Sequence, residues 1–267
     1  MRAIILLAIV SLSACHESSK GQIDAIPAAL SFDGAASSDP ALLRAHGERL
    51  TRVLGCTGCH GTELQGERFY ELYASNLTRD LANYSDPQLE RLLREGVRPT
   101  GRDVWGMPSE LFQHLSQTDM VALIAHLRTL RPTGEPTGKM LPFEAETKKL
   151  IADGMFKPAA AFVQESRNVG PVDLGTGHAL GRYMTRVTWA ECHSTKLEGH
   201  DDTPNLVVVG AYSRAEFEQL MTKGIAKDNR KIKPLMASVA KGRFAYMTPH
   251  ERDALYNYLK ARAELLP

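Results

Sequence analysis

The chain has 267 residues, of which 43% are hydrophobic and 24% are charged. These values are ordinary for a folded globular protein, and the length suggests about two domains. The 32 basic and 31 acidic side chains nearly cancel, which gives no support to nucleic-acid binding, because proteins that bind nucleic acid usually carry a basic excess.

The first residues have the features of an export signal. Arg2 is followed by an apolar run over 3–10, which is too short to span a bilayer. The sequence Leu12-Ser13-Ala14-Cys15 resembles the bacterial lipoprotein signal, in which cleavage before the cysteine leaves a lipidated N-terminus. The alternative is an ordinary signal peptide that contains a cysteine by chance. We expect a lipoprotein-type signal over 1–14, lipidation of Cys15 and a flexible tether over 15–38. The folded part is then expected in the periplasm or cell envelope, anchored to a bacterial membrane by its lipid.

A c-type haem attachment motif follows the first predicted helix. Asp39-Pro40 is typical of a helix start, and apolar residues at helical spacing continue to about residue 54. The next residues are Cys56-Thr57-Gly58-Cys59-His60. At this spacing both cysteines add to the vinyl groups of one haem, and the histidine reaches the iron. A redox dithiol does not need a histidine here, and a zinc site needs a second ligand pair that is not evident. We therefore expect haem c on Cys56 and Cys59, with His60 as the proximal ligand.

A candidate sixth ligand lies between two further predicted helices. Capping signals and apolar spacing predict these helices at 85–96 and 116–130. Met107 lies in the sequence Val104-Trp105-Gly106-Met107-Pro108, where glycine and proline indicate a loop. Met120 has apolar neighbours on one helix face and is expected in the core. Met107 lacks such neighbours, which leaves its thioether free for iron.

Short motifs accompany these ligands across residues 40–130. They are Cys56-Thr57-Gly58-Cys59-His60-Gly61, Glu63-Leu64, Gly66, Asn76-Leu77-Thr78, Ser85-Asp86 with Leu89, Gly96-Val97, Met107-Pro108 and, in the last helix, Asp119. Together they resemble a class I cytochrome c domain, particularly those of dihaem cytochromes and of the cytochrome subunits of membrane-bound alcohol and sugar dehydrogenases. The resemblance implies a mostly helical fold with crossing first and last helices, a haem crevice, and His60 and Met107 as axial ligands. Relatives often carry a proline at position 75 whose carbonyl orients the histidine, so Ser75 must offer its own carbonyl.

A connector is expected over residues 132–174, which contain four prolines up to Pro158 and show little periodicity. It joins two expected domains, at 39–131 and 175–267. A short helix is predicted within it, over 144–153.

The second half of the chain repeats the first. An offset of 133 residues superposes Cys59-His60 on Cys192-His193. An offset of 128 superposes SDPQLERLLREGV, at 85–97, on SRAEFEQLMTKGI, at 213–225. A repeated domain is the simplest explanation, so TWAECHST at 188–195 is expected to be the attachment segment of a second domain.

The second attachment segment has Trp189 in place of the first cysteine. Cys192 can still form one thioether, and His193 is in register as the proximal ligand. Met236 follows its helix-ending glycine by 12 residues, as Met107 follows its own by 11, which favours Met236 as the distal ligand. Trp189 either covers the edge of a haem or fills the volume of an absent one. We expect a second haem, held by a single thioether.

The expected fold is mainly α, with two tandem class I cytochrome c domains whose helices pack around haem crevices and a proline-containing linker between them. We expect an exported, membrane-anchored carrier with no catalytic residues of its own. It passes single electrons between a dehydrogenase or quinol oxidoreductase and a downstream acceptor such as a terminal oxidase. Two alternatives stay open. One is a haem enzyme of the peroxidase type with an open iron position in the second domain, and the other is a monohaem carrier whose second domain is a haem-free docking module.

Overall fold

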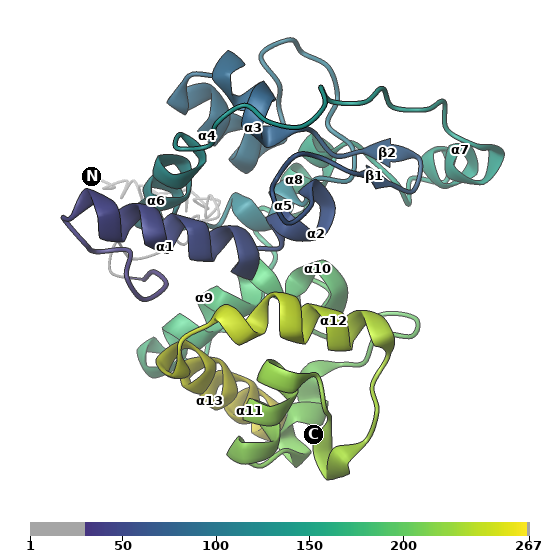
Figure 1. Cartoon of the computed structure of the whole chain (residues 1–267). Coiled ribbons are helices and arrows are strands. Elements are labelled where there is room, and N and C mark those ends of the chain that lie inside the picture. Colours follow the sequence, from purple (N-terminus) through teal and green to yellow (C-terminus); the bar gives the residue numbers. More distant parts are fainter. Residues whose placement is uncertain (1–29, 266–267) are drawn as a thin grey trace, which may run out of the picture.

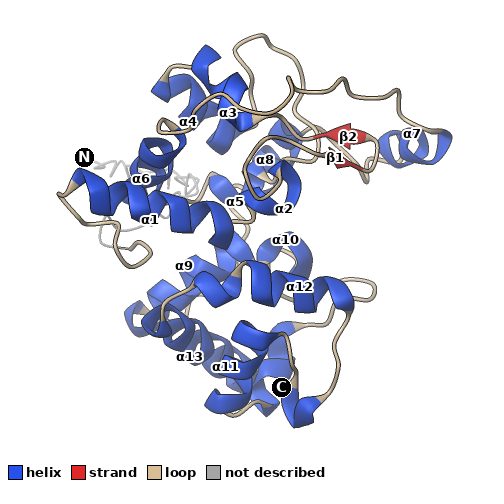
Figure 2. Cartoon of the chain, in the orientation of Figure 1, coloured by secondary structure: helices blue, strands red, loops and turns tan. Residues whose placement is uncertain are grey.

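The chain folds into two helical lobes that lie against each other (Figure 1). The computed structural model describes residues 30–265. These are mainly helical, as expected, with one two-stranded hairpin among them (Figure 2). The predicted signal peptide, Cys15 and most of the predicted tether lie outside the described residues. Within 30–265, no helix is both long enough and apolar enough to cross a membrane.

The first lobe begins with a helix whose start is set by its sequence. The Asp39 side chain accepts a hydrogen bond from the N–H of Ala41 (2.7 Å), and Pro40 fills the first helical position, where an N–H would have no helical partner. α4 starts with the predicted capping box at Ser85 and ends at Gly96 in the left-handed region (φ 65°). The elements of this lobe are α1 (Pro40–Val53), α2 (Cys56–His60), β1 (Arg68–Phe69), β2 (Leu72–Tyr73), α3 (Leu77–Asp80), the 3-10 turn η1 (Leu81–Asn83), α4 (Asp86–Glu95), α5 (Ser109–Phe112) and α6 (Gln117–Leu127).

The second lobe has the same order of main helices. α11 starts with a capping box formed by Ser213 and Glu216 and ends at Gly224 (φ 67°), which matches the start and end of α4. Its elements are η2 (Thr176–His178), α9 (Ala179–Thr188), α10 (Ala190–His193), η3 (Leu206–Ala211), α11 (Arg214–Lys223), η4 (Lys227–Asn229), α12 (Pro234–Gly242), η5 (Phe244–Tyr246) and α13 (Pro249–Leu265).

The first and last helices of each lobe cross at a glycine. A Cβ atom on Gly47 of α1 would lie 2.0 Å from the carbonyl oxygen of Ala122 in α6. A Cβ atom on Gly181 of α9 would lie 2.3 Å from the carbonyl oxygen of Ala254 in α13. Only glycine lets the two backbones approach this closely. Met120 is 0% exposed beneath the first crossing, so its predicted place in the core is confirmed.

The linker carries the expected helix and a second one. α7 (Ala145–Ala152) lies within the predicted range of 144–153. α8 (Ala159–Ser166) has no clear signal in the sequence, and it packs on α4 and α5 of the first lobe. The N–H of Ala159 donates to the carbonyl of Val104 (2.8 Å), and Val163 is buried. Eight residues after a proline give too short a periodic pattern to identify, so the first lobe extends beyond its predicted end at residue 131.

Part of the predicted flexible tether, residues 32–35, is packed rather than free. The Phe32 side chain is 1% exposed, and its N–H donates to Oδ2 of Asp119 (3.1 Å). The N–H of Asp33 donates to Oε1 of Glu251 (2.8 Å). Backbone amides make these contacts with side chains far along the sequence, and amides leave no pattern that sequence analysis can detect. Two adjacent residues thus bind one acid in each lobe.

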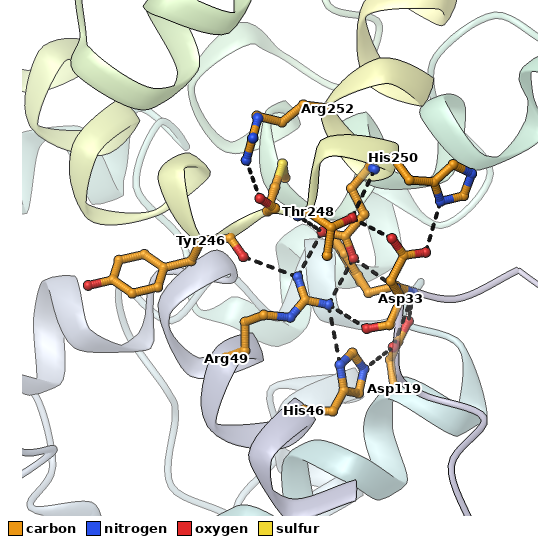
Figure 3. A network of polar contacts seen from close by, with 11 residues as sticks. Asp33, His46, Arg49, Asp119, Tyr246, Thr248, His250 and Arg252 are labelled. Atoms are coloured by element: carbon orange, nitrogen blue, oxygen red, sulfur yellow. Dashed lines mark hydrogen bonds and ion pairs between the residues drawn. The ribbon is translucent and has the colours of Figure 1, made fainter. Parts of the chain in front are cut away.

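These two acids occupy equivalent places, and the hydrogen bonds around them form a seam between the lobes. Figure 3 shows part of this seam, around Asp33, Arg49 and Asp119. Asp119 and Glu251 lie in the first turns of α6 and α13, and both are 0% exposed. Arg49 of α1 donates to both carboxylate oxygens of Glu251, at 2.7 and 2.8 Å. The hydroxyl of Tyr183 in α9 donates to Asp119 at 2.7 Å. The first helix of each lobe therefore supplies a donor to the acid of the other lobe.

Asp119 receives further donors from its own lobe. The Ser116 hydroxyl donates to it at 3.0 Å, and Nε2 of His46 lies 3.0 Å from its other oxygen. Burial and the charge of Asp119 raise the pKa of Tyr183 well above its ordinary value. The phenol therefore stays protonated and remains a donor.

The substitution Arg49→Met should destabilise the protein strongly, because it leaves Glu251 buried without its counter-charge. We expect the free energy of unfolding to fall by about 3 kcal/mol, since breaking a buried pair has this order of effect. Arg91→Met is the matched control: Arg91 pairs with Glu95 at 2.9 Å, but both side chains are at least half exposed. Its loss should be below roughly 0.5 kcal/mol. Urea unfolding of the purified full-length chain measures both, and equal losses would contradict the role of the seam.

Candidate functional site

The predicted attachment motif forms a single helical turn, α2, at the end of α1. Gly55 separates the two helices and adopts a left-handed conformation (φ 84°), which a side chain would disfavour. Gly61 ends the turn with φ 78° and ψ 161°. The two bends isolate the five residues from Cys56 to His60. Of these, Cys56, Cys59 and His60 lie on the wall of a cleft.

One cleft contains all four residues predicted to hold the first haem: Cys56, Cys59, His60 and Met107. The open space in the cleft is about 730 Å³, which includes space continuous with solvent. The walls are mostly apolar. They include Leu54, Phe69, Leu72, Val104, Trp105 and Phe112.

The linker supports one wall of the cleft. The ring of Trp105 lies 5.2 Å from the ring of Phe143 and 5.1 Å from that of Phe156, and both of these rings come from the linker. The linker therefore holds a cleft-lining side chain in place as well as joining the lobes.

His60 is oriented as an iron ligand requires. Its Nδ1 donates to the carbonyl oxygen of Ser75 at 2.8 Å, so Ser75 does offer its carbonyl to this histidine, as expected. This bond fixes the ring and leaves Nε2 with its lone pair available. Burial lowers the pKa of His60 below its ordinary value, so the imidazole is neutral at pH 7, as a metal ligand must be.

Cys56 and Cys59 are unpaired thiols. Burial raises the pKa of Cys56 to about 11 and also raises that of Cys59. A redox dithiol is instead activated by a lowered pKa. The two thiols therefore lack the lowered pKa that activates a redox dithiol.

Met107 lies in a loop, as predicted, because α5 begins only at Ser109. It is half-buried against the core and lines the cleft. Arg98, which the sequence pattern does not identify, also lines the cleft, and its Nε is buried without a hydrogen-bond partner among the described residues. An acidic group of a bound molecule would satisfy it.

These features fit haem c in the first lobe. The cleft combines two unpaired thiols, an imidazole with one free nitrogen, a thioether and a guanidinium whose buried Nε has no partner among the described residues, all within mostly apolar walls. Within residues 30–265, no three His, Cys, Asp or Glu side chains are grouped closely enough to hold a metal ion by themselves.

The second lobe repeats the hydrogen bonds around the attachment turn. Nδ1 of His193 donates to the carbonyl of Pro204 at 2.9 Å, as His60 does to Ser75. The N–H of Gly199 donates to the carbonyl of His193 at 2.9 Å, and the corresponding bond in the first lobe, from Gly66 to His60, is 2.8 Å. The predicted internal repeat therefore extends to the individual bonds that orient the two histidines.

The two lobes differ at the start of the turn. The second lobe has no counterpart of Gly55, so α9 continues through Trp189 into α10 with helical backbone angles. Trp189 is 2% exposed, and its ring stacks on that of Phe244 (5.0 Å, 12°) and on that of Phe217 (6.4 Å, 18°). It also lies 5.7 Å from the ring of His193. The tryptophan is thus part of the core of this lobe.

The other predicted ligands of the second lobe are spread over two helices. Cys192 and His193 share α10, and Cys192 is an unpaired, half-buried thiol. Met236 is half-buried against the core from the first turn of α12. Met247, the other methionine near this site in sequence, is 2% exposed in the core. The residues of the second lobe fit a haem less completely than those of the first, because Trp189 occupies the space beside His193.

The chain matches no protein-family model. No curated protein is significantly similar to it in sequence.

Ser194 carries backbone strain that its counterpart avoids. It has φ 67° and ψ 162°, a region that essentially only glycine occupies, and the equivalent residue in the first lobe is Gly61. The substitution Ser194→Gly relieves this strain but removes the hydrogen bond from Glu198 N–H to the Ser194 hydroxyl (3.2 Å). The net effect should be a rise of about 1 kcal/mol in the free energy of unfolding. Gly61→Ser should lower it by about 1–3 kcal/mol. Denaturant unfolding measures both, and a destabilised Ser194→Gly variant would contradict the strain.

Proposed function

We propose that the protein is an exported c-type cytochrome that carries single electrons on haem bound in the first lobe. The observation that carries the proposal is the cleft that brings Cys56, Cys59, His60 and Met107 together. Bound haem supplies a one-electron iron couple whose potential depends on its axial ligands and surroundings.

In this proposal, each residue of the cleft has a distinct task. Cys56 and Cys59 would hold the group by thioethers, and His60, fixed by the Ser75 carbonyl, would serve as the proximal ligand. Met107 would serve as the distal ligand, and a thioether ligand favours a comparatively high potential. The apolar walls keep water from the iron. Arg98 would donate hydrogen bonds to an acidic group of the haem.

Two observations bear on the second lobe in opposite directions. The repeated bonds around His193 support a second haem, held by one thioether to Cys192 with His193 and Met236 as ligands. The packing of Trp189 between Phe244 and Phe217 favours a monohaem carrier whose second lobe is a haem-free module. Counting the haems decides between them.

We also propose that Cys15 is lipidated and anchors the protein to a membrane of the bacterial envelope, with the folded part in the periplasm. The proposed redox partners are a dehydrogenase or a quinol oxidoreductase on one side and an acceptor such as a terminal oxidase on the other. Charge is nearly balanced over the chain, so docking would depend on local patches rather than on long-range steering.

Expression in a host that matures c-type cytochromes should yield a chain with covalent haem. Intact mass counts the haems, and the reduced pyridine haemochrome band shifts to the red when a haem has a single thioether. The double substitution Cys56→Ala and Cys59→Ala should remove the haem of the first lobe completely. Cys192→Ala should remove a second covalent haem if the second lobe holds one, and should leave the mass increment unchanged if it does not. A wild-type chain without covalent haem would disprove the proposed function.

Met107→Leu should lower the reduction potential and make the iron accessible to external ligands, because it removes the proposed distal thioether. The matched control is Met120→Leu, at a methionine that is 0% exposed in the same lobe but belongs to the core. This exchange of similar volume should leave the spectrum unchanged. Redox titration and cyanide binding measure the two variants. Rapid cyanide binding by both, or by neither, would argue against Met107 as the ligand.

A further inference from the structure

Arg243, in the second lobe, reaches across to the attachment turn of the first. It follows the last residue of α12, and its side chain is 13% exposed. Its Nε donates to the carbonyl of Val53, the last residue of α1, at 3.2 Å. Its Nη2 donates to the carbonyl of Thr188, the last residue of α9, at 3.4 Å. One guanidinium thus binds the ends of both helices that lead into the attachment turns, where the helix dipole favours a cation.

The first lobe is shaped to receive this guanidinium. A Cβ atom on Gly55 would lie 2.8 Å from Cζ of Arg243, so any side chain at this position would displace the arginine. Gly55 therefore serves two purposes: it permits the left-handed bend before Cys56 and leaves room for a residue of the other lobe.

Arg243 is paired with an acid that also belongs to the second lobe. Its Nη1 donates to Oε2 of Glu191 at 2.9 Å. Glu191 lies in α10, yet it lines the cleft of the first lobe together with Cys56 and Cys59. The first site is therefore completed by a charged pair from the second lobe.

Both charges of this pair lie beside the attachment turn of the first lobe. Glu191 lines the cleft together with Cys56 and Cys59. The guanidinium of Arg243 lies against Gly55, the residue before Cys56. Because Arg243 is mostly shielded from water, solvent screens its field only partly.

We propose that two residues of the second lobe contribute to the site in the first lobe. Arg243 positions the attachment turn, and the opposing charges of Arg243 and Glu191 set the reduction potential of the haem held there. The inference rests on the proposed haem in the first lobe. It holds with or without a second haem.

The sign of each effect follows from electrostatics. Ferric haem carries one more positive charge than ferrous haem, so a nearby cation favours reduction and a nearby anion favours oxidation. Arg243→Gln should lower the potential of the first-lobe haem, and Glu191→Gln should raise it. The double variant should return towards the wild-type value. Arg243→Lys keeps the charge and should shift the potential less than Arg243→Gln does.

The experiment is a spectroelectrochemical titration of the holoprotein, with the first-lobe haem assigned by its absence from the Cys56→Ala, Cys59→Ala variant. Arg91→Gln and Glu95→Gln are the controls, because they remove the same charges from an exposed pair in α4. Opposite shifts in Arg243→Gln and Glu191→Gln, each larger than its control, support the proposal. Shifts of the same sign, or none beyond the controls, overturn it while leaving the haem carrier intact.

Two further outcomes have a defined meaning. If Arg243→Gln does not fold, Glu191→Gln and Arg243→Lys still test the charge effect, since the Glu191 side chain is 37% exposed and tolerates an amide. Glu191→Gln without an upward shift then overturns the inference. A wild-type chain without covalent haem overturns both the inference and the proposed function.

Discussion

The arrangement of the molecule depends on two carboxylates that are removed from water, Asp119 and Glu251. A buried charge is tolerated only with a full set of donors, and in both cases part of that set comes from the other lobe, through Tyr183 and Arg49. The amides of residues 32 and 33 complete the two sets. Separation of the lobes would remove these donors from the two acids. It would also leave Tyr183 and Arg49 without their acceptors. This constraint keeps α10 and the end of α12 against the first cleft, where Glu191 and Arg243 act.

Local features of the fold could be predicted from the sequence. The capping box at Ser85 forms as expected, and the repeated segment forms one at Ser213, because a cap involves residues three positions apart. The role of the Ser75 carbonyl could be predicted as well, since the backbone supplies an acceptor whatever the side chain is. The packing of residues 32–35 and of α8 could not, because these contacts join segments far apart in sequence.

The same distinction applies to the candidate site. Cysteine, histidine and methionine could be identified because their chemistry is rare and their spacing is specific. Arg98, Glu191 and Arg243 could not, because a single charged residue among many has no pattern, and its role appears only when the fold brings it to the cleft. Trp189 could be predicted in part. The motif identifies its position, but its place in the core follows only from its stacking on Phe244 in the structure.

The reciprocal seam also limits how lobes can combine. Arg49 and Tyr183 hold equivalent positions, two residues after the crossing glycines Gly47 and Gly181, and so do the acids that they bind. The two contacts have diverged, however: one is a charge pair and the other a phenol–carboxylate bond. Two first lobes placed across the same seam would set Arg49 against Asp119, whose shorter side chain is already engaged by His46 and Ser116. Two second lobes would leave Glu251 without a cation. The divergence thus provides specificity against mispairing between copies, while the linker keeps the correct partner at high local concentration.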